Sequence, residues 1–275
     1  MSLRRRKLRT LRRRDGLIAH ARDATSQNGE DGVIARLFAL LPAPGGRRRV
    51  CVDVGAWDGR HLSNTYSLLV PGGAGDGGDD TLSPGLSRVS TSTGTKSPVQ
   101  SEDQSTLSRV STSTGTKSPV QSEMGDDDDA RDDDAGGRPW RGVLVEADPE
   151  RFRELSALHG PLGNVCLCRC VSCAEDSPDA LPAVLRDAQC PRVVDFVSID
   201  VDGADYWLFH DLLLRSDAFA PRVVCVEFNP TIPDDVLYVQ PRRDDVRHGS
   251  SLAALVELAA RHDMVLVETT LSNAF

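Results

Sequence analysis

The chain lacks any long apolar run. No stretch of its 275 residues is apolar for long enough to cross a membrane or to form the core of a secretory signal peptide. It also lacks an even set of cysteines, since it has seven, and this argues for reduced thiols in a cytosolic-type compartment. We therefore expect an intracellular protein, with the cytoplasm as the favoured location and no transmembrane segment.

Acidic residues are missing between Arg4 and Arg14, whereas the run from Asp126 to Asp134 is almost entirely acidic. Because these runs offset each other, the formal net charge of −9 says little about binding partners. The basic segment, residues 1–22, is compatible with an organelle presequence, a nuclear signal, a nucleic-acid arm or a membrane-surface patch. None of these is favoured, and we expect no nucleic-acid partner.

Residues 71–139 lack the apolar side chains that a core needs. The seventeen residues Leu86–Glu102 recur as Leu107–Glu123, a period of 107 − 86 = 21, and are mostly Ser, Thr, Gly and Pro. We interpret this segment as a disordered insert in a surface loop, although Ser97-Pro98 and Ser118-Pro119, one in each copy, would also suit phosphorylation. Removing its 69 residues leaves 275 − 69 = 206, enough for one domain built from residues 23–70 and 140–275.

Outside the insert, apolar runs alternate with helix-compatible segments. Strand-like runs cover residues 50–54, 142–146, 193–199, 222–229 and 264–268, and helical spacing covers residues 206–214 and 252–260. This alternation predicts an α/β fold with a parallel, Rossmann-like sheet and helices on both faces. The first four runs end in acidic residues, which would lie at the edge where such sheets bind ligands; they include Asp53, Glu146, Asp200, Asp202 and Glu227.

The first run leads into Asp53-Val-Gly-Ala-Trp-Asp-Gly59, a glycine turn that lets the backbone approach a ligand. An acidic residue about 20 positions further on accepts hydrogen bonds from ribose hydroxyls in dinucleotide-type pockets. Glu146 lies 146 − 53 = 93 positions on, and without the insert the separation is 93 − 69 = 24. The two segments are therefore predicted to form one site.

Six short motifs in this order resemble FkbM-type methyltransferases: Ser26-Gln-Asn-Gly-Glu-Asp31, Asp53–Gly59, Ser63-Asn-Thr65, Gly142–Asp148, Ser198-Ile-Asp-Val-Asp-Gly203 and Val226-Glu-Phe-Asn-Pro230. The resemblance implies a class I methyltransferase sheet that binds S-adenosylmethionine. It implies that the turn with Asp53, Gly55, Trp57 and Gly59 holds the methionine part, that Glu146 holds the ribose and that Asp200 completes the pocket. It further implies O-methylation of a hydroxyl on a small molecule or sugar.

Proton removal from such an acceptor requires a base, and Asp202 and Glu227 are the candidates at the sheet edge. His248, after the irregular residues 240–247, is a weaker one. Trp57 stands where many class I enzymes have a glycine, and its indole would either close part of the pocket or stack on a ligand. Because the chain ends soon after residue 268, we expect the final antiparallel strand to be missing and the exposed sheet edge to favour self-association.

Two other functions stay open. A non-catalytic ligand-binding protein could keep this fold, and Asp200, Asp202 and Asp205 together suit a metal-dependent hydrolase. We nevertheless expect Asp148 and Asp205 to cap helices. The cysteines Cys166, Cys168, Cys170 and Cys173 are interpreted as small buried strand residues and not as a zinc site, so no metal ligand is assigned.

Overall fold

The computed structural model describes residues 16–42, 45, 47–72, 140–214 and 219–275. Most of the basic segment 1–22 and nearly all of the predicted insert 71–139 lie outside these ranges, so the predictions for them are not addressed. Within the described residues the strands form a six-stranded sheet of order β3-β2-β1-β4-β5-β6. The strands are β1 (Arg49–Val54), β2 (Trp140–Glu146), β3 (Val165–Cys168), β4 (Val193–Ile199), β5 (Ala220–Glu227) and β6 (Asn273–Ala274).

All neighbouring strands are parallel except β5 and β6. The helices of the described residues are α1 (Glu30–Leu40), α2 (Tyr66–Leu69), α3 (Pro149–His159), α4 (Leu181–Asp187), α5 (Asp205–Leu214) and α6 (Leu252–Ala260), with single 3₁₀ turns at Leu17–His20 and Gly160–Leu162. The helices α2 to α6 lie between successive strands, as expected of βαβ crossovers between the parallel ones, whereas α1 precedes β1. The predicted α/β class, the parallel sheet and the helices at 206–214 and 252–260 are confirmed.

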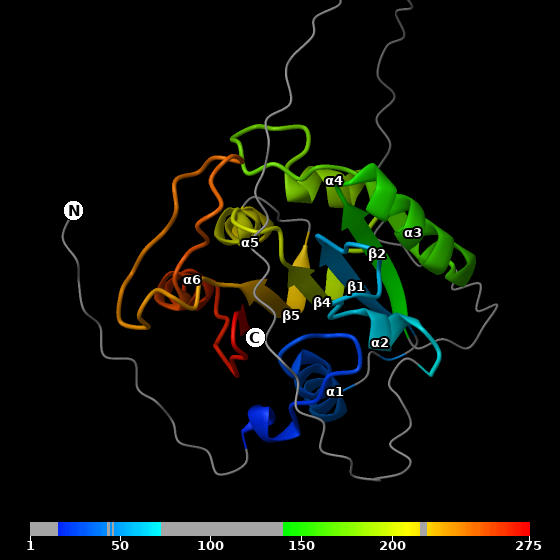
Figure 1. Ribbon diagram of the computed structural model, residues 1–275, viewed down its shortest axis with the longest axis horizontal. Coiled ribbons are helices and arrows are strands. Elements are labelled where there is room, and N and C mark those ends of the chain that lie inside the picture. The colour runs from blue at the N-terminus through cyan, green and yellow to red at the C-terminus, as the bar shows by residue number, and fades with distance from the viewer. Residues whose placement is uncertain (1–15, 43–44, 46, 73–139, 215–218) are drawn as a thin grey trace, which may run out of the picture. The chain divides into compact units, whose positions relative to one another are not determined.

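Helices cover both faces of the sheet, and Figure 1 shows α1 and α5 on opposite sides of it. Alternate strand residues feed two apolar cores. One core joins Val52, Val197 and Val224 to α4, α5 and α6. The other joins Cys51, Leu144 and Phe196 to α1 together with Leu69 and Leu155. Their burial explains why the strand sequences are almost continuously apolar.

The prediction that the final antiparallel strand is missing was wrong. Asn273 and Ala274 form β6, which pairs antiparallel with Val226 and Glu227 of β5. The predicted strand at 264–268 is not assigned as one, yet its end lies beside β6, because the backbone N–H of Val267 donates to Phe275 and that of Phe275 donates to Glu268. The final strand was missed because two residues are too short to show a period-2 pattern.

The order of the strands reverses between β1 and β4. From β1 the chain proceeds to β2 and β3 on one side, and it then returns to place β4 and β5 on the other. In open α/β sheets the crevice beyond the carboxyl ends of the strands at such a reversal is where ligands bind.

Among the described residues, none of the helices combines the length and apolar character of a membrane span.

Candidate functional site

The glycine turn that follows β1 lies at this reversal. Gly55 has a φ of 86°, and a Cβ on it would collide with the backbone carbonyl oxygen of Asp200. Glycine is therefore required at position 55 both for its left-handed backbone and for the close approach of the two chain segments. Gly59, with a φ of 77°, faces the side chains of Leu155 and His159, so α3 packs directly against the end of the turn.

Trp57 adopts a φ of 53°, a conformation that glycine would adopt without strain and that costs other residues about 1 kcal/mol. Its side chain is 46% exposed, and the guanidinium carbon of Arg151 lies 4.6 Å from the ring centroid. The indole thus stacks on a cation from α3 at the surface of the turn. Neither predicted role, closing the pocket or stacking on a ligand, is tested by this contact.

Glu146 joins the two predicted parts of the site. One carboxylate oxygen accepts a hydrogen bond from the backbone N–H of Trp57 at 2.7 Å, and the other accepts one from the N–H of Asp148 at 2.7 Å. Asp148 in turn caps α3 by accepting from Glu150 and Arg151, as predicted. The end of β2 is therefore held against the glycine turn, although 89 positions separate Glu146 from Trp57.

Asp53 lies inside the site. It is only 4% exposed, and its Oδ2 accepts a hydrogen bond from the hydroxyl of Thr65 at 2.6 Å. Burial raises the pKa of Asp53 to about 6, with the charge of Asp200 contributing further. In this position the carboxyl holds the Ser63–Thr65 turn in place.

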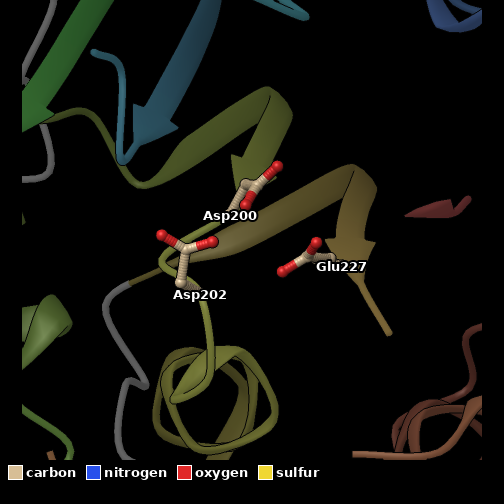
Figure 2. A group of neighbouring side chains, drawn as sticks. All are labelled: Asp200, Asp202 and Glu227. Atoms are coloured by element: carbon tan, nitrogen blue, oxygen red, sulfur yellow. The ribbon is translucent and has the colours of Figure 1, made fainter. Parts of the chain in front are cut away.

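The carboxyl groups of Asp200, Asp202 and Glu227 come together beyond β4 and β5 (Figure 2). One oxygen of each lies within 4.8 Å of the others. The strand register accounts for part of this arrangement, because Ser198 pairs with Cys225 and two further steps along parallel strands bring Asp200 beside Glu227. Asp202 is exposed, with a φ of 56°, and an arginine of the opposite loop, Arg247, lies 3.7 Å away.

Asp205 is not part of this group. Its two oxygens accept hydrogen bonds from the backbone N–H groups of Val201 and Gly203, both at 2.8 Å, so it caps the start of α5 as predicted. The metal-binding set predicted for the hydrolase alternative, Asp200 with Asp202 and Asp205, is therefore wrong in its third member. Glu227, from the next strand, occupies that place.

Burial raises the pKa of Glu227, and the charge of Asp200 is the next cause. Burial also raises the pKa of Asp200, followed by the charge of Asp202. The two carboxyls hydrogen-bond to each other. Two carboxyl groups this close resist simultaneous ionisation, so the pair retains a proton at pH values where an isolated carboxyl has lost it.

A cleft of about 450 Å³ opens beside these carboxyls. It is lined by Asp202, Gly203, Glu227, Phe228, Asn229, Pro230, Arg247, His248 and Gly249. Two contacts hold the loop that forms its outer wall: the Asn229 Nδ2 donates to the backbone oxygen of His248 at 2.6 Å, and Gly203 packs closely against Val246. The cleft places Asp202 and Glu227 where a small molecule can reach them.

One further polar residue, Glu30, was not assigned a role from the sequence. Glu30 is fully buried, and its Oε1 accepts hydrogen bonds from Thr270 at 2.6 Å and from the Asn273 amide at 3.2 Å. Its Oε2 accepts from the backbone of Asn28 at 2.7 Å. The acidic pair Glu30-Asp31 in an otherwise apolar helix was the available signal, but nothing in the sequence indicated its distant partners.

The four cysteines from Cys166 to Cys173 do not lie together on one buried strand, because β3 ends at Cys168. Cys166 lies on β3, Cys173 is buried, and Cys168 and Cys170 are exposed, so the interpretation as buried strand residues was wrong for the latter two. Both follow or end an edge strand, where one side faces solvent. Among the described residues, the side chains spaced to hold a metal ion are instead the three acids of Figure 2, Asp200, Asp202 and Glu227.

No family model, curated protein or solved structure matches this chain. The motifs quoted from the sequence and the geometry of the sheet edge are accordingly the basis for any statement about its function.

Proposed function

We propose that the chain is an S-adenosylmethionine-dependent methyltransferase that modifies a hydroxyl group on a small molecule or sugar. The observation that carries this proposal is the hydrogen bond between Glu146 and the backbone of Trp57. It unites the glycine turn and the acidic strand end, the two segments that the sequence motifs assign to one cofactor.

The chemistry of the site suits this cofactor. S-adenosylmethionine carries positive charge on its sulfonium and ammonium groups, and the sheet edge presents several carboxylates at the carboxyl ends of β1, β2 and β4. Glu146 would hold the ribose hydroxyls, the turn with Gly55, Trp57 and Gly59 the methionine part, and Asp200 the inner wall. When bound, the cofactor supplies an electrophilic methyl group.

The acceptor would enter the cleft beside Asp202 and Glu227. Methyl transfer is a displacement in which the protein chiefly aligns donor and acceptor and removes a proton. Glu227 is half-buried at the inner wall and faces the cleft, which favours it as the base, whereas the exposed Asp202 is better placed to orient the acceptor. The wall opposite, from Asn229 to Gly249, would then select the acceptor.

The test is calorimetric titration of the full chain with S-adenosylmethionine. Glu146→Gln should weaken binding at least tenfold, because loss of a hydrogen bond to a charged group costs about 1.5–3 kcal/mol. Glu150→Gln is the matched control, because it removes the same charge from an exposed residue in the first turn of α3. Absence of binding by the folded wild-type chain would overturn the proposal.

Turnover separates the remaining readings. Binding of the cofactor without methyl transfer to any hydroxyl acceptor in a broad screen would favour the non-catalytic ligand-binding alternative. Hydrolysis that depends on an added divalent cation, without cofactor binding, would favour the metal-dependent hydrolase.

A further inference from the structure

Asp200 and Glu227 lack a positively charged partner. Neither forms an ion pair with an arginine, lysine or histidine of the described residues, and Asp202 has only the distant, exposed Arg247. Glu30 and Asp53 add two more buried carboxyl groups on the same face of the sheet. Half-buried carboxylates without a cation are costly unless a ligand or a metal ion compensates them.

Asn273 gives an independent indication of a missing cation. It is only 2% exposed, and its side-chain oxygen, Oδ1, accepts no hydrogen bond from the described residues. Asn273 lies directly opposite Glu227 in the β5–β6 pair, so both side chains leave the sheet on the same face and their Cβ atoms are neighbours. Its amide nitrogen is already bound to Glu30. A buried amide oxygen beside Glu227 is therefore left without a donor.

From these observations we propose that Asp200, Asp202 and Glu227 bind one divalent cation of the oxygen-preferring class, with the Asn273 side chain, whose oxygen has no partner among the described residues, beside Glu227 on the same face of the sheet. The three carboxyl oxygens lie within 4.8 Å of one another. Ligands on opposite sides of Ca²⁺ are about 4.6–5.2 Å apart, and those around Mg²⁺ about 4.0–4.2 Å. Oxygens no more than 4.8 Å apart can therefore share a Ca²⁺ ion, and closer approach of the three would be needed for Mg²⁺.

The position of the group indicates what the cation does. Asp202 and Glu227 line the cleft, so a cation between them lies at its inner wall. It would select acceptors that present two neighbouring oxygen atoms, such as vicinal hydroxyls, because oxygen atoms complete the coordination that three carboxylates begin. This second part rests on the proposed methyl transfer, whereas binding of the cation does not.

The experiment titrates the full chain with CaCl₂ and, separately, with MgCl₂ by calorimetry, without S-adenosylmethionine. We expect saturable binding of one ion per chain, and a rise in melting temperature as the cation is added. Glu227→Gln and Asp202→Asn should each weaken binding at least tenfold. Glu175→Gln, which removes an exposed acid outside the site, should bind as the wild type does.

Thermal unfolding without added cation shows whether each variant is folded. Absence of saturable binding of either ion to the folded wild type would overturn the proposal, and so would equal binding by folded Glu227→Gln. Because no cofactor is present, binding of the cation would stand even if methyl transfer failed. Cofactor binding without cation binding would leave the proposed function intact and remove this inference.

Discussion

Asp195 and Asp200 lie five positions apart on and just after β4, yet their surroundings differ in charge. Asp195 is fully buried near the start of the strand, where Arg47 donates to it at 2.8 Å, Arg222 at 2.9 Å and the backbone of Val50 at 3.0 Å. Although burial opposes ionisation, these bonds hold the pKa of Asp195 below its ordinary value. Asp200, at the other end, has carboxyl groups as its charged neighbours.

The difference separates an acid whose partners stabilise the fold from one that we propose acts on a ligand. At the amino-terminal edge of the sheet, an acid with two arginines and an amide has all it needs to be stable in the folded chain. At the carboxyl-terminal edge, burial and neighbouring carboxyl charges raise the pKa of both Asp200 and Glu227, and neither forms an ion pair with a basic side chain of the described residues, which is typical of a site that completes itself with a ligand. The predictions below test this contrast, from the largest expected effect to the smallest.

Asp195→Ala should lower the free energy of unfolding by about 4 kcal/mol, because it leaves two partly buried arginines without their shared partner. Arg47→Ala alone should cost less, since Arg222 remains. Urea unfolding followed by circular dichroism measures both. A loss below 1 kcal/mol for Asp195→Ala would show that the pair of arginines contributes little and would remove the contrast.

Asp53→Asn should gain free energy of unfolding relative to the wild type as the pH rises from about 4 to about 6. The pKa of Asp53 is about 6 in the folded chain against an ordinary value of 3.8, so the folded protein holds its proton more tightly. The wild type therefore loses stability between about pH 4 and pH 6, by at most about 3 kcal/mol at 1.36 kcal/mol per pH unit. An asparagine can still accept a hydrogen bond from the Thr65 hydroxyl, but its side chain does not titrate.

The measurement compares urea unfolding of Asp53→Asn and the wild type at pH 4.5 and pH 7.5. Other groups titrate in both proteins, so only the difference between the two curves is informative. If that difference is the same at both pH values, Asp53 is ionised in the folded chain and burial does not control it.

Glu227→Gln should leave the free energy of unfolding unchanged or raise it by about 1 kcal/mol. The rate of the proposed methyl transfer should fall at least a hundredfold. Removing one carboxyl from a pair that resists simultaneous ionisation relieves their repulsion, and sites arranged for function commonly become more stable when their acids are replaced. The result opposes that expected for Asp195→Ala. Substantial destabilisation, measured by urea unfolding, would place Glu227 with the structural acids.

Trp57→Gly should change the free energy of unfolding by less than about 1 kcal/mol. Glycine relieves the left-handed backbone, worth about 1 kcal/mol, but gives up the stacking on Arg151, worth about 0.5–1 kcal/mol. Trp57→Ala loses the stacking and keeps the strain, so it should be less stable than Trp57→Gly. If alanine and glycine are equal in urea unfolding, the positive φ of Trp57 carries no strain.

The sequence predicts the sheet well because its buried parallel strands are apolar runs with little ambiguity. It also predicts that Asp53, Glu146, Asp200 and Glu227 share one edge, since the carboxyl ends of parallel strands meet there. It does not predict the register that brings Asp200 beside Glu227, or that Asp205 turns back to cap its own helix. Those outcomes depend on contacts between distant segments, which no local pattern encodes.

Dependence on distant contacts also explains the error at the end of the chain. β6 has only two residues, and the hydrogen bond between Thr270 and Glu30 joins positions 240 apart in the sequence. Neither feature leaves a periodic signal. For the cysteines, alternation predicted a shared face of a strand, but β3 ends at Cys168, and of the two cysteines beyond it Cys170 is exposed and Cys173 is buried.

The ladder between β1 and β2 begins with Arg49 beside Trp140, positions separated by 140 − 49 = 91. The entropy lost when a chain segment is closed into a loop grows only with the logarithm of its length, about 0.6 kcal/mol for each doubling. Trp140 also lies at the amino-terminal end of β2, six residues and about 20 Å from Glu146. Lengthening or shortening the chain between Arg49 and Trp140 should therefore change the folding free energy little. The chain rejoins the sheet at Trp140, at the end of β2 that is remote from the cleft.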